Sequence, residues 1–295
     1  MTTGITSLTF TEKPYLTTAE YKAAPTAQQT NNLVVGGNEA AQDAELAAVI
    51  LRASSFMTEY LNQSLIATQM VETQRVRMTP QGYISLHPNN NPVIALVNFQ
   101  YGTDPNNLQT LTDPSTAWFE NSQVIIPLSQ LSTSYSSQGP LAFGGTASPF
   151  TQIFTKYTYV AGYVNTTMGA ATAGDTSITV VDGSGFVAGQ QYLISDGAKT
   201  ETITVGSSYV FGSTTVPLAT ALSYTHIAGA AIGNLPAGVK QAAILLTTAF
   251  LKVRGDSAMM MSMTQRPIGQ VVGSEFYGSN VKMALDMIDR YRRVR

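Results

Sequence analysis

Residues 38–65, NEAAQDAELAAVILRASSFMTEYLNQSL, carry the clearest structural signal in the chain. Apolar residues recur there at steps of three and four, which places them on one face of an α-helix. Asn38 is suited to cap this helix, and Asp43 and Glu45 lie in its N-terminal part, where negative charge is favourable. The pattern predicts a helix over about residues 39–64, with an apolar face made of Leu46, Val49, Ile50, Ala53, Phe56, Met57, Tyr60 and Leu61.

The segment before this helix, residues 1–37, is interpreted as an extended arm with one short helix. In PYLTTAEYKAA, Thr17 or Thr18 is suited to the N-cap position and Glu20 to the first turn. The following PTAQQTNNLVVGG contains Pro and Gly, which end the helical pattern.

Two more amphipathic helices are predicted near the C-terminus. LPAGVKQAAILLTTAFLKVRG (235–255) has Pro236 in its first turn and Gly255 at its end, and NVKMALDMIDRYRRVR (280–295) follows. Because all these helices have an apolar face and lie far apart in sequence, we expect them to pack as a small bundle of long amphipathic helices.

The middle of the chain has the pattern of β-strands. Residues 74–102 alternate between Pro, Gly and Asn boundaries, which predicts a hairpin and a following strand, and further strands are predicted in 118–129 and 154–165. The polar, Gly-rich segment 132–150 is interpreted as a long exposed loop. Together with the helices, these strands predict the α+β class.

Residues 166–234 differ from both neighbouring regions. Short alternating runs are separated by Gly-Asp, Asp-Gly and Gly-Ser turns at spacings of about 8 to 12 residues, which is typical of a small antiparallel barrel or sandwich. The flanking segments belong to another pattern. We therefore expect a core made of residues 1–165 and 235–295, with an inserted β domain over 166–234.

Composition limits the classes of function. The chain has no cysteine, which excludes disulfides, zinc–thiolate sites and thiol nucleophiles, and fits folding in a reducing environment. A formal net charge of −2 argues against bulk nucleic-acid binding. The N-terminus has no signal-peptide pattern, and the apolar run AAILLTTAFL is shorter than the ~20 residues of a membrane span, so no membrane association is expected.

The sequence offers little for catalysis. His87 precedes Pro88, and His226 lies inside the inserted domain; neither has a companion at metal-ligand spacing, so both are interpreted as surface or turn residues. The serine in VDGSGF lacks the spacing of a nucleophile elbow, and no phosphate loop or dinucleotide fingerprint is present. We expect no enzyme activity, no cofactor and no metal site.

The acidic residues of the inserted domain allow two interpretations. Oxygen ligands on turns suit calcium, but Asp-Gly corners are also ordinary turn chemistry, and this second interpretation is favoured. The residues are Asp175, Asp182, Asp196 and Glu201.

Two unusual segments remain near the C-terminus. Met259, Met260, Met261 and Met263 form a Met-rich run that suits either packing beside the preceding helix or an interface loop, since methionine serves both uses. Four of the last six residues are arginine. Helix-end electrostatics accounts for one or two of them, so the whole group suggests docking on an acidic surface or contact with phosphates.

Taken in order, several segments resemble the head–tail connector, or adaptor, proteins of long-tailed bacteriophages. They are YLTTAEYKAAPT (15–26), QDAELAAVILRASSFMTEYLNQSL (42–65), HPNNNPVIALVNFQYGTDP (87–105), LPAGVKQAAILLTTAFLKVRG (235–255) and DRYRRVR (289–295). The likeness spans nearly the whole chain, and no motif within it is catalytic.

The resemblance implies a structural protein of the virion neck, made in the host cytoplasm. Such proteins form a ring, commonly of twelve subunits, beneath the portal, extend the channel through which double-stranded DNA passes without sequence recognition, and provide the platform for the next connector (a stopper) or a tail protein. The portal-docking residues implied here are Arg290, Tyr291, Arg292, Arg293, Val294 and Arg295.

The inserted domain departs from compact members of this family and leaves an alternative open: a decoration or adhesin protein whose β domain binds host glycan. That function needs an exposed aromatic platform. The candidate residues mostly occupy alternating strand positions, which favours core packing; they are Phe186, Tyr192, Tyr209, Phe211 and Tyr224.

Overall fold

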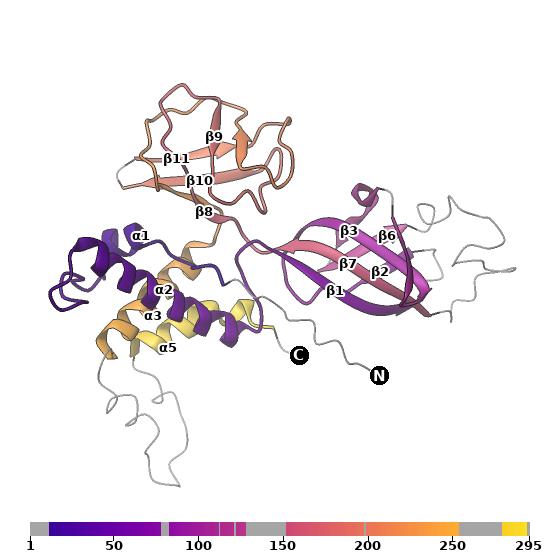
Figure 1. Ribbon diagram of the computed structural model, residues 1–295, viewed down its shortest axis with the longest axis horizontal. Coiled ribbons are helices and arrows are strands. Elements are labelled where there is room, and N and C mark those ends of the chain that lie inside the picture. The colour runs from indigo at the N-terminus through magenta and orange to yellow at the C-terminus, as the bar shows by residue number, and fades with distance from the viewer. Residues whose placement is uncertain are drawn as a thin grey trace, which may run out of the picture. The chain divides into compact units, whose positions relative to one another are not determined.

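The protein combines helices with antiparallel sheets, which confirms the α+β class (Figure 1). The chain forms two compact units, residues 1–62 together with 235–295, and residues 63–234. The sequence analysis places domain boundaries after residues 165 and 234. The compact units divide after residues 62 and 234, so the second boundary is the same and the first differs. The computed structural model describes residues 12–77, 83–111, 113–120, 122–127, 152–197, 199–253 and 279–293.

The first unit is helical. Its 17-residue helix α3 (Ala237–Val253) contacts both the 23-residue α2 (Glu39–Leu61) and the 10-residue α5 (Ser279–Ile288), and Figure 1 shows the three side by side. The described residues show these three helices in contact through α3, but they do not show the expected bundle of long helices. The last helix is also shorter than predicted, since α5 gives way to a 3₁₀ turn, η3 (Asp289–Tyr291).

Helix α2 follows its sequence pattern closely. The Asn38 side chain accepts a hydrogen bond from the Ala41 amide, and the helix ends at Asn62, which adopts a left-handed conformation with φ of 55°. Most of the predicted apolar face is buried, and the Phe56 ring packs edge-on against Phe250 of α3 at 6.1 Å. The buried members are Leu46, Val49, Ile50, Ala53, Met57 and Leu61.

The N-terminal arm is fixed to the helices by polar contacts. Thr17 caps α1 (Thr18–Ala23) in a reciprocal pair with Glu20, as one of the two predicted caps, and Glu20 also forms an ion pair with Lys240 of α3. The buried Tyr21 hydroxyl shares a 3.0 Å hydrogen bond with Thr248 and accepts one from the Gln28 amide at 3.1 Å. The described part of the arm is therefore an integral part of the helical unit.

The second unit begins with two antiparallel sheets around one core. The first sheet has the order β1-β7-β3-β4 and the second β2-β6-β5. Both contribute to a single apolar cluster, which includes Phe99 and Tyr157 from the first sheet and Ile84 and Ile126 from the second. The strands are β1 (Thr68–Arg77), β2 (Tyr83–Leu86), β3 (Val93–Asp104), β4 (Asn107–Thr110), β5 (Trp118–Glu120), β6 (Gln123–Pro127) and β7 (Gln152–Ala161), with a 3₁₀ turn η1 (Pro114–Thr116).

The hairpin predicted from residues 74–102 is wrong, because β1 and β2 enter different sheets. β1 pairs with β7 along its whole length, from Thr68 opposite Ala161 to Arg77 opposite Gln152. With only four residues, β2 offers a much shorter ladder than the ten residues of β7. A side-chain link replaces the lost pairing, since the His87 amide donates to the Gln74 Oε1 atom at 3.1 Å.

Residues 165–233 contain six short strands that enclose a separate apolar cluster, which includes Phe186, Ile194 and Ile232. Their sheets have the orders β11-β10-β13-β8 and β12-β9. Within the described residues the strands do not close into a barrel, so the two sheets correspond more closely to the sandwich alternative. The strands are β8 (Asn165–Thr167), β9 (Ser177–Thr179), β10 (Gln191–Asp196), β11 (Lys199–Thr204), β12 (Thr215–Pro217) and β13 (Ala231–Gly233).

Backbone hydrogen bonds join the places where the chain enters and leaves this unit. The Ala67 amide donates to the Tyr163 carbonyl at 2.8 Å, and the Tyr163 amide donates to the Leu65 carbonyl at 2.6 Å. The next residue after Tyr163 is also bonded: the Val164 carbonyl accepts a hydrogen bond from the Asn234 amide at 3.0 Å. The start, the middle and the end of the second unit are therefore held together by main-chain contacts.

We predict that Tyr21→Phe destabilises the helical unit by about 1–3 kcal/mol, because the Gln28 amide and the Thr248 hydroxyl lose their buried partner. Urea unfolding monitored by circular dichroism measures this loss. Tyr224→Phe is the control, since that side chain is 49% exposed. Equal effects of the two substitutions would contradict the assignment.

Candidate docking site at the C-terminus

The predicted docking residues begin where α5 ends, and the chain there lies against the last turn of α2. The Arg293 amide donates a hydrogen bond to the Leu61 carbonyl at 3.0 Å, and the Asn62 side-chain amide donates to the Arg293 carbonyl at 3.4 Å. The last carbonyl groups of a helix lack partners within the helix. In α2, the C-terminal segment supplies the missing partner of one such carbonyl, because the Arg293 amide binds that of Leu61.

A second contact fixes the same segment through side chains. The Tyr60 hydroxyl donates to the Asp289 Oδ1 atom at 2.8 Å, and the Arg292 guanidinium lies 4.9 Å from the centre of the Tyr60 ring. Partial burial and the hydrogen bond to Asp289 raise the pKa of Tyr60, and Arg292 opposes that shift. Tyr60 was predicted only as part of the apolar face of α2, and Asp289 was not singled out. An acidic residue directly before the arginine run was the available signal.

The arginines therefore differ in what they contact. Arg292 is held at Tyr60 and lies 3.9 Å from Asp289, whereas the exposed Arg290 stacks over the neighbouring Tyr291 ring at 4.6 Å. Val294 and Arg295 lie outside the described residues. So do Met259, Met260, Met261 and Met263, the predicted long loop 132–150, and Gly255.

The interpretation of His226 as a surface or turn residue is wrong, because its side chain is fully buried. Its Nε2 atom lies 2.7 Å from Glu201, and its Nδ1 atom lies 3.6 Å from Asp196. Both carboxylates also accept backbone amides from residues 223–227: Glu201 from Ser223 and Asp196 from Ile227. The alternating pattern of this region gave no sign that two distant acidic residues would enclose the imidazole.

All four acidic residues of segment 166–234 accept hydrogen bonds from backbone amides. Asp175 accepts from Thr172 at 2.7 Å, and Asp182 accepts from Ser184 at 2.9 Å. Burial alone would raise the pKa of Glu201, but its hydrogen bonds, chiefly from Ser223 and His226, outweigh burial and lower it. Within the described residues no group of three or more His, Asp or Glu is placed to hold a metal ion. The hydrogen bonds from backbone amides to these four carboxylates favour the interpretation as turn residues over calcium ligands.

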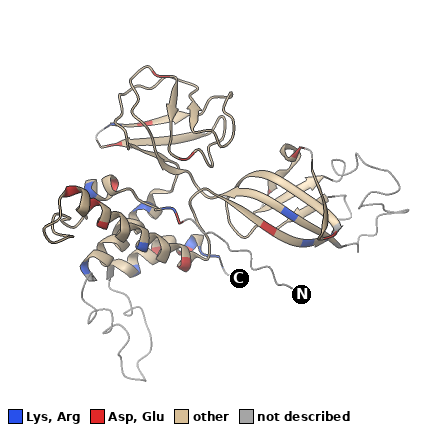
Figure 2. Ribbon diagram, viewed as in Figure 1, with Lys and Arg blue, Asp and Glu red and all other residues tan. Residues whose placement is uncertain are grey.

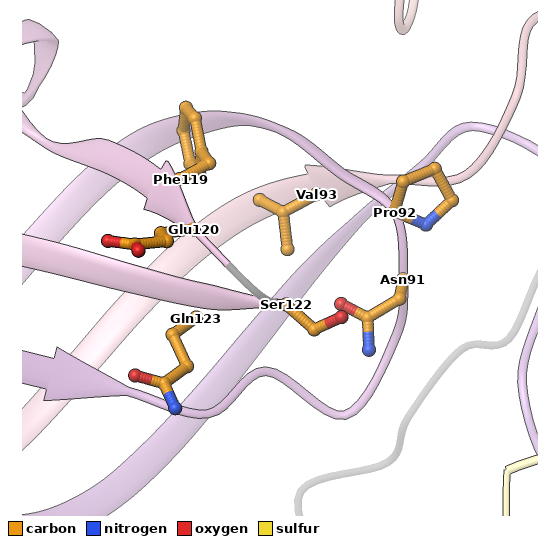
Figure 3. A pocket seen from close by; sticks show the side chains of 7 residues that line it. All are labelled: Asn91, Pro92, Val93, Phe119, Glu120, Ser122 and Gln123. Atoms are coloured by element: carbon orange, nitrogen blue, oxygen red, sulfur yellow. The ribbon is translucent and has the colours of Figure 1, made fainter.

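An open hollow lies beside β5 and β6 (Figure 3). Its volume is about 200 Å³, below the roughly 300–1,000 Å³ of typical ligand pockets. Its wall combines an aromatic ring with amide, hydroxyl and carboxylate groups, but these do not include a nucleophile paired with a base. The lining residues are Asn91, Pro92, Val93, Phe119, Glu120, Ser122 and Gln123.

The aromatic residues proposed for glycan binding fall into two groups. Phe186 and Tyr192 are buried and pack 4.6 Å apart, and Tyr209 packs against Phe186. Phe211 and Tyr224 are 39% and 49% exposed. Most of the predicted platform is therefore core.

Among the described residues, no helix has the length and hydropathy to cross a membrane.

Comparisons with known proteins give little further information. No protein-family model matches the chain, and no curated protein matches it in sequence. One solved structure, titled "Neck of empty GTA particle computed with C6 symmetry", aligns over 96% of this chain and 95% of its own, at 13% identity and a TM-score of 0.36. A TM-score of this size does not establish a common fold, and no function is carried over from it.

Tyr60→Ala is expected to release the C-terminal segment, because it removes both the hydrogen bond to Asp289 and the stacking of Arg292. Losing about 1–2 kcal/mol of local stability raises the open population about 5- to 30-fold. Limited trypsin digestion followed by mass spectrometry measures cleavage after Arg290 and Arg292. Tyr60→Phe keeps the ring and should give an intermediate rate; cleavage of all three proteins at one rate would refute the anchor.

The lowered pKa of Glu201 gives a pH prediction with a defined sign. The stability from ionised Glu201 is present above its unfolded value near 4.5 and is lost as pH falls through the lower folded value. Glu201→Gln should therefore be less stable than the native chain at pH 7, and the difference should shrink as pH falls from about 6 to 3. Thermal unfolding across this range measures it, with Asp175→Asn as the control. A constant difference would contradict the role of Glu201.

Proposed function

We propose that this protein is a structural subunit of a phage-like virion neck, a head–tail connector that assembles as a ring beneath the portal. In this proposal its partners are the portal, further copies of itself, and the next connector or tail protein. The number of copies expected from the resemblance is twelve. Double-stranded DNA passes through the ring without being read for sequence.

The observation that carries this proposal is that four of the five resembling segments meet in the helical unit; the fifth, 87–105, forms β3 of the second unit. Tyr15, from segment 15–26, donates its amide to the Ser54 hydroxyl of α2 at 3.0 Å. Tyr21, from the same segment, reaches Thr248 of segment 235–255. Arg293, from the final segment, donates to Leu61. Segments separated by up to 230 or so residues thus depend on one another, which supports a shared architectural role.

The C-terminal segment has properties suited to docking. Its base is held at the end of α2 by Tyr60 and the Leu61 carbonyl, so the following residues start from a defined position. A binding segment that is already ordered loses less entropy on association. Arg290 is exposed and its guanidinium stacks on Tyr291, and arginine and tyrosine are common anchors of interfaces. In our proposal this segment contacts an acidic surface of the portal.

A structural role also agrees with the use of the polar groups. Glu72 accepts hydrogen bonds from the hydroxyls of Tyr157 and Tyr159 and from the Asn89 amide, and Glu201 accepts two backbone amides and contacts His226. These groups hold turns and strands in place. We therefore propose that the protein is not an enzyme.

Native mass spectrometry of the purified chain, alone and mixed with its portal, tests the proposal. We expect a ring of fixed count, or a monomer that becomes one on the portal. Arg290→Gln should weaken portal binding about tenfold while the fold is kept, as expected for loss of an interface anchor. Lys282→Gln, an exposed charge on α5, is the matched control.

Two outcomes separate the alternatives. A monomer that ignores the portal would refute the connector function and favour the glycan-binding alternative, for which the exposed Phe211 and Tyr224 are the residues to test. A ring that binds portal equally well with Arg290→Gln would keep the connector function and remove this residue from docking. Deleting residues 289–295 is less informative, because it also removes the cap of α2.

A further inference from the structure

The outward face of β1 and β7 carries three cations in neighbouring positions. Burial alternates along β1, and Val76 points into the core, so Arg75 and Arg77 on either side of it point outward. On β7, Lys156 is exposed between the buried Thr155 and Tyr157. Figure 2 marks the charged residues of these strands.

The strand register brings these three residues together. Lys156 lies opposite Thr73, Arg75 opposite Phe154, and Arg77 opposite Gln152. Residues two apart along a strand are about 6.5 Å apart, and adjacent strands are about 4.8 Å apart. The three positive charges therefore occupy one continuous patch, which we call the basic face, defined by Arg75, Arg77 and Lys156.

On β1 and β7 no acidic side chain points outward beside the basic face. The one carboxylate of β1, Glu72, binds the hydroxyls of the buried Tyr157 and Tyr159. Within the described residues none of the three cations forms an ion pair. Lys22, Arg52 and Lys240, by contrast, pair with carboxylates.

One of the cations is also ordered by an aromatic ring. The Arg75 guanidinium lies 4.6 Å from the centre of the Phe154 ring. A guanidinium stacked in this way keeps its N–H edge free to donate, and a planar fork of donors matches a phosphate group. Arg75 is therefore held in a conformation that suits an anionic oxygen ligand.

We propose that the basic face binds the phosphate backbone of double-stranded DNA. Three cations at neighbouring positions of one sheet, none with an ion pair among the described residues, complement a surface with one negative charge per roughly 1.7 Å of axis. Phosphate contacts carry no sequence information, so the binding is without base preference. This inference rests on the proposed function, in which a ring repeats the basic face around DNA, and it assigns the contact to the sheet rather than to the C-terminal arginines.

The test compares the full chain with a variant carrying Arg75→Gln, Arg77→Gln and Lys156→Gln. Retention on an immobilised 30-base-pair duplex, measured between 50 and 200 mM salt, gives the affinity and its salt dependence. Three phosphate contacts reduce affinity about 40-fold over this range. The native chain should show at least this dependence, and the variant should lose that share of it. Duplexes rich in A·T and in G·C should bind equally.

A second variant with the same charge change is the control. Arg52→Gln, Lys252→Gln and Lys282→Gln remove three exposed cations of the helical unit. It should retain DNA binding and its salt dependence. Circular dichroism and native mass spectrometry establish that both variants fold and assemble as the native chain does.

The outcomes distinguish this inference from the proposed function. Equal DNA binding by the native chain and the basic-face variant would overturn the inference, as would a ring that has no affinity for DNA. If the basic-face variant binds DNA normally but fails to assemble or to bind portal, the basic face contacts an acidic protein surface instead. A monomer that ignores the portal but loses DNA binding in the variant would leave the inference standing and remove the connector function.

Discussion

Packing of α3 against both α2 and α5 is the constraint on which the rest of the structure depends. It joins residues on both sides of the 63–234 unit, so the chain has to leave the helices and return to them. Closing so long a loop carries an entropic cost, although that cost grows only slowly with length. The backbone contacts that link Leu65, Tyr163, Val164 and Asn234 hold the entry and exit of the second unit together and limit the span to be closed.

Local signals in the sequence predicted local structure well. The caps and the three- and four-residue spacing each depend on neighbours within one or two helical turns. The structure has the predicted helix α2 with most of its apolar face buried, and it has both predicted N-caps, Thr17 of α1 and Asn38 of α2. Non-local choices were not predictable in the same way. β1 reads as half of a hairpin with β2, but its ladder forms with β7, some eighty residues away, because that partner matches it in length.

The candidate sites show the same division. The arginine run was visible in the sequence, but its attachment to Tyr60 was not, because Tyr60 and Asp289 are 229 residues apart. Likewise, the turn signals around Asp196 and His226 were readable, whereas the burial of the imidazole between two carboxylates depends on how β10, β11 and the 223–227 segment pack. Charge and turn propensity are properties of a short segment, whereas the residues that a given side chain contacts are determined by the fold.

The cap of α2 by Arg293 also affects the order of events during synthesis. Leu61 emerges from the ribosome long before the segment that completes its helix, since Asn62 and Arg293 are 231 residues apart. At about 5–20 residues per second, the delay is roughly 10 to 50 seconds. The second unit has time to fold within that interval, and residues 289–293 reach their final position only after both units have been synthesised. A chain that stops before residue 289 therefore lacks the Arg293 contact with Leu61, and the end of its α2 differs from that of a chain carrying this segment.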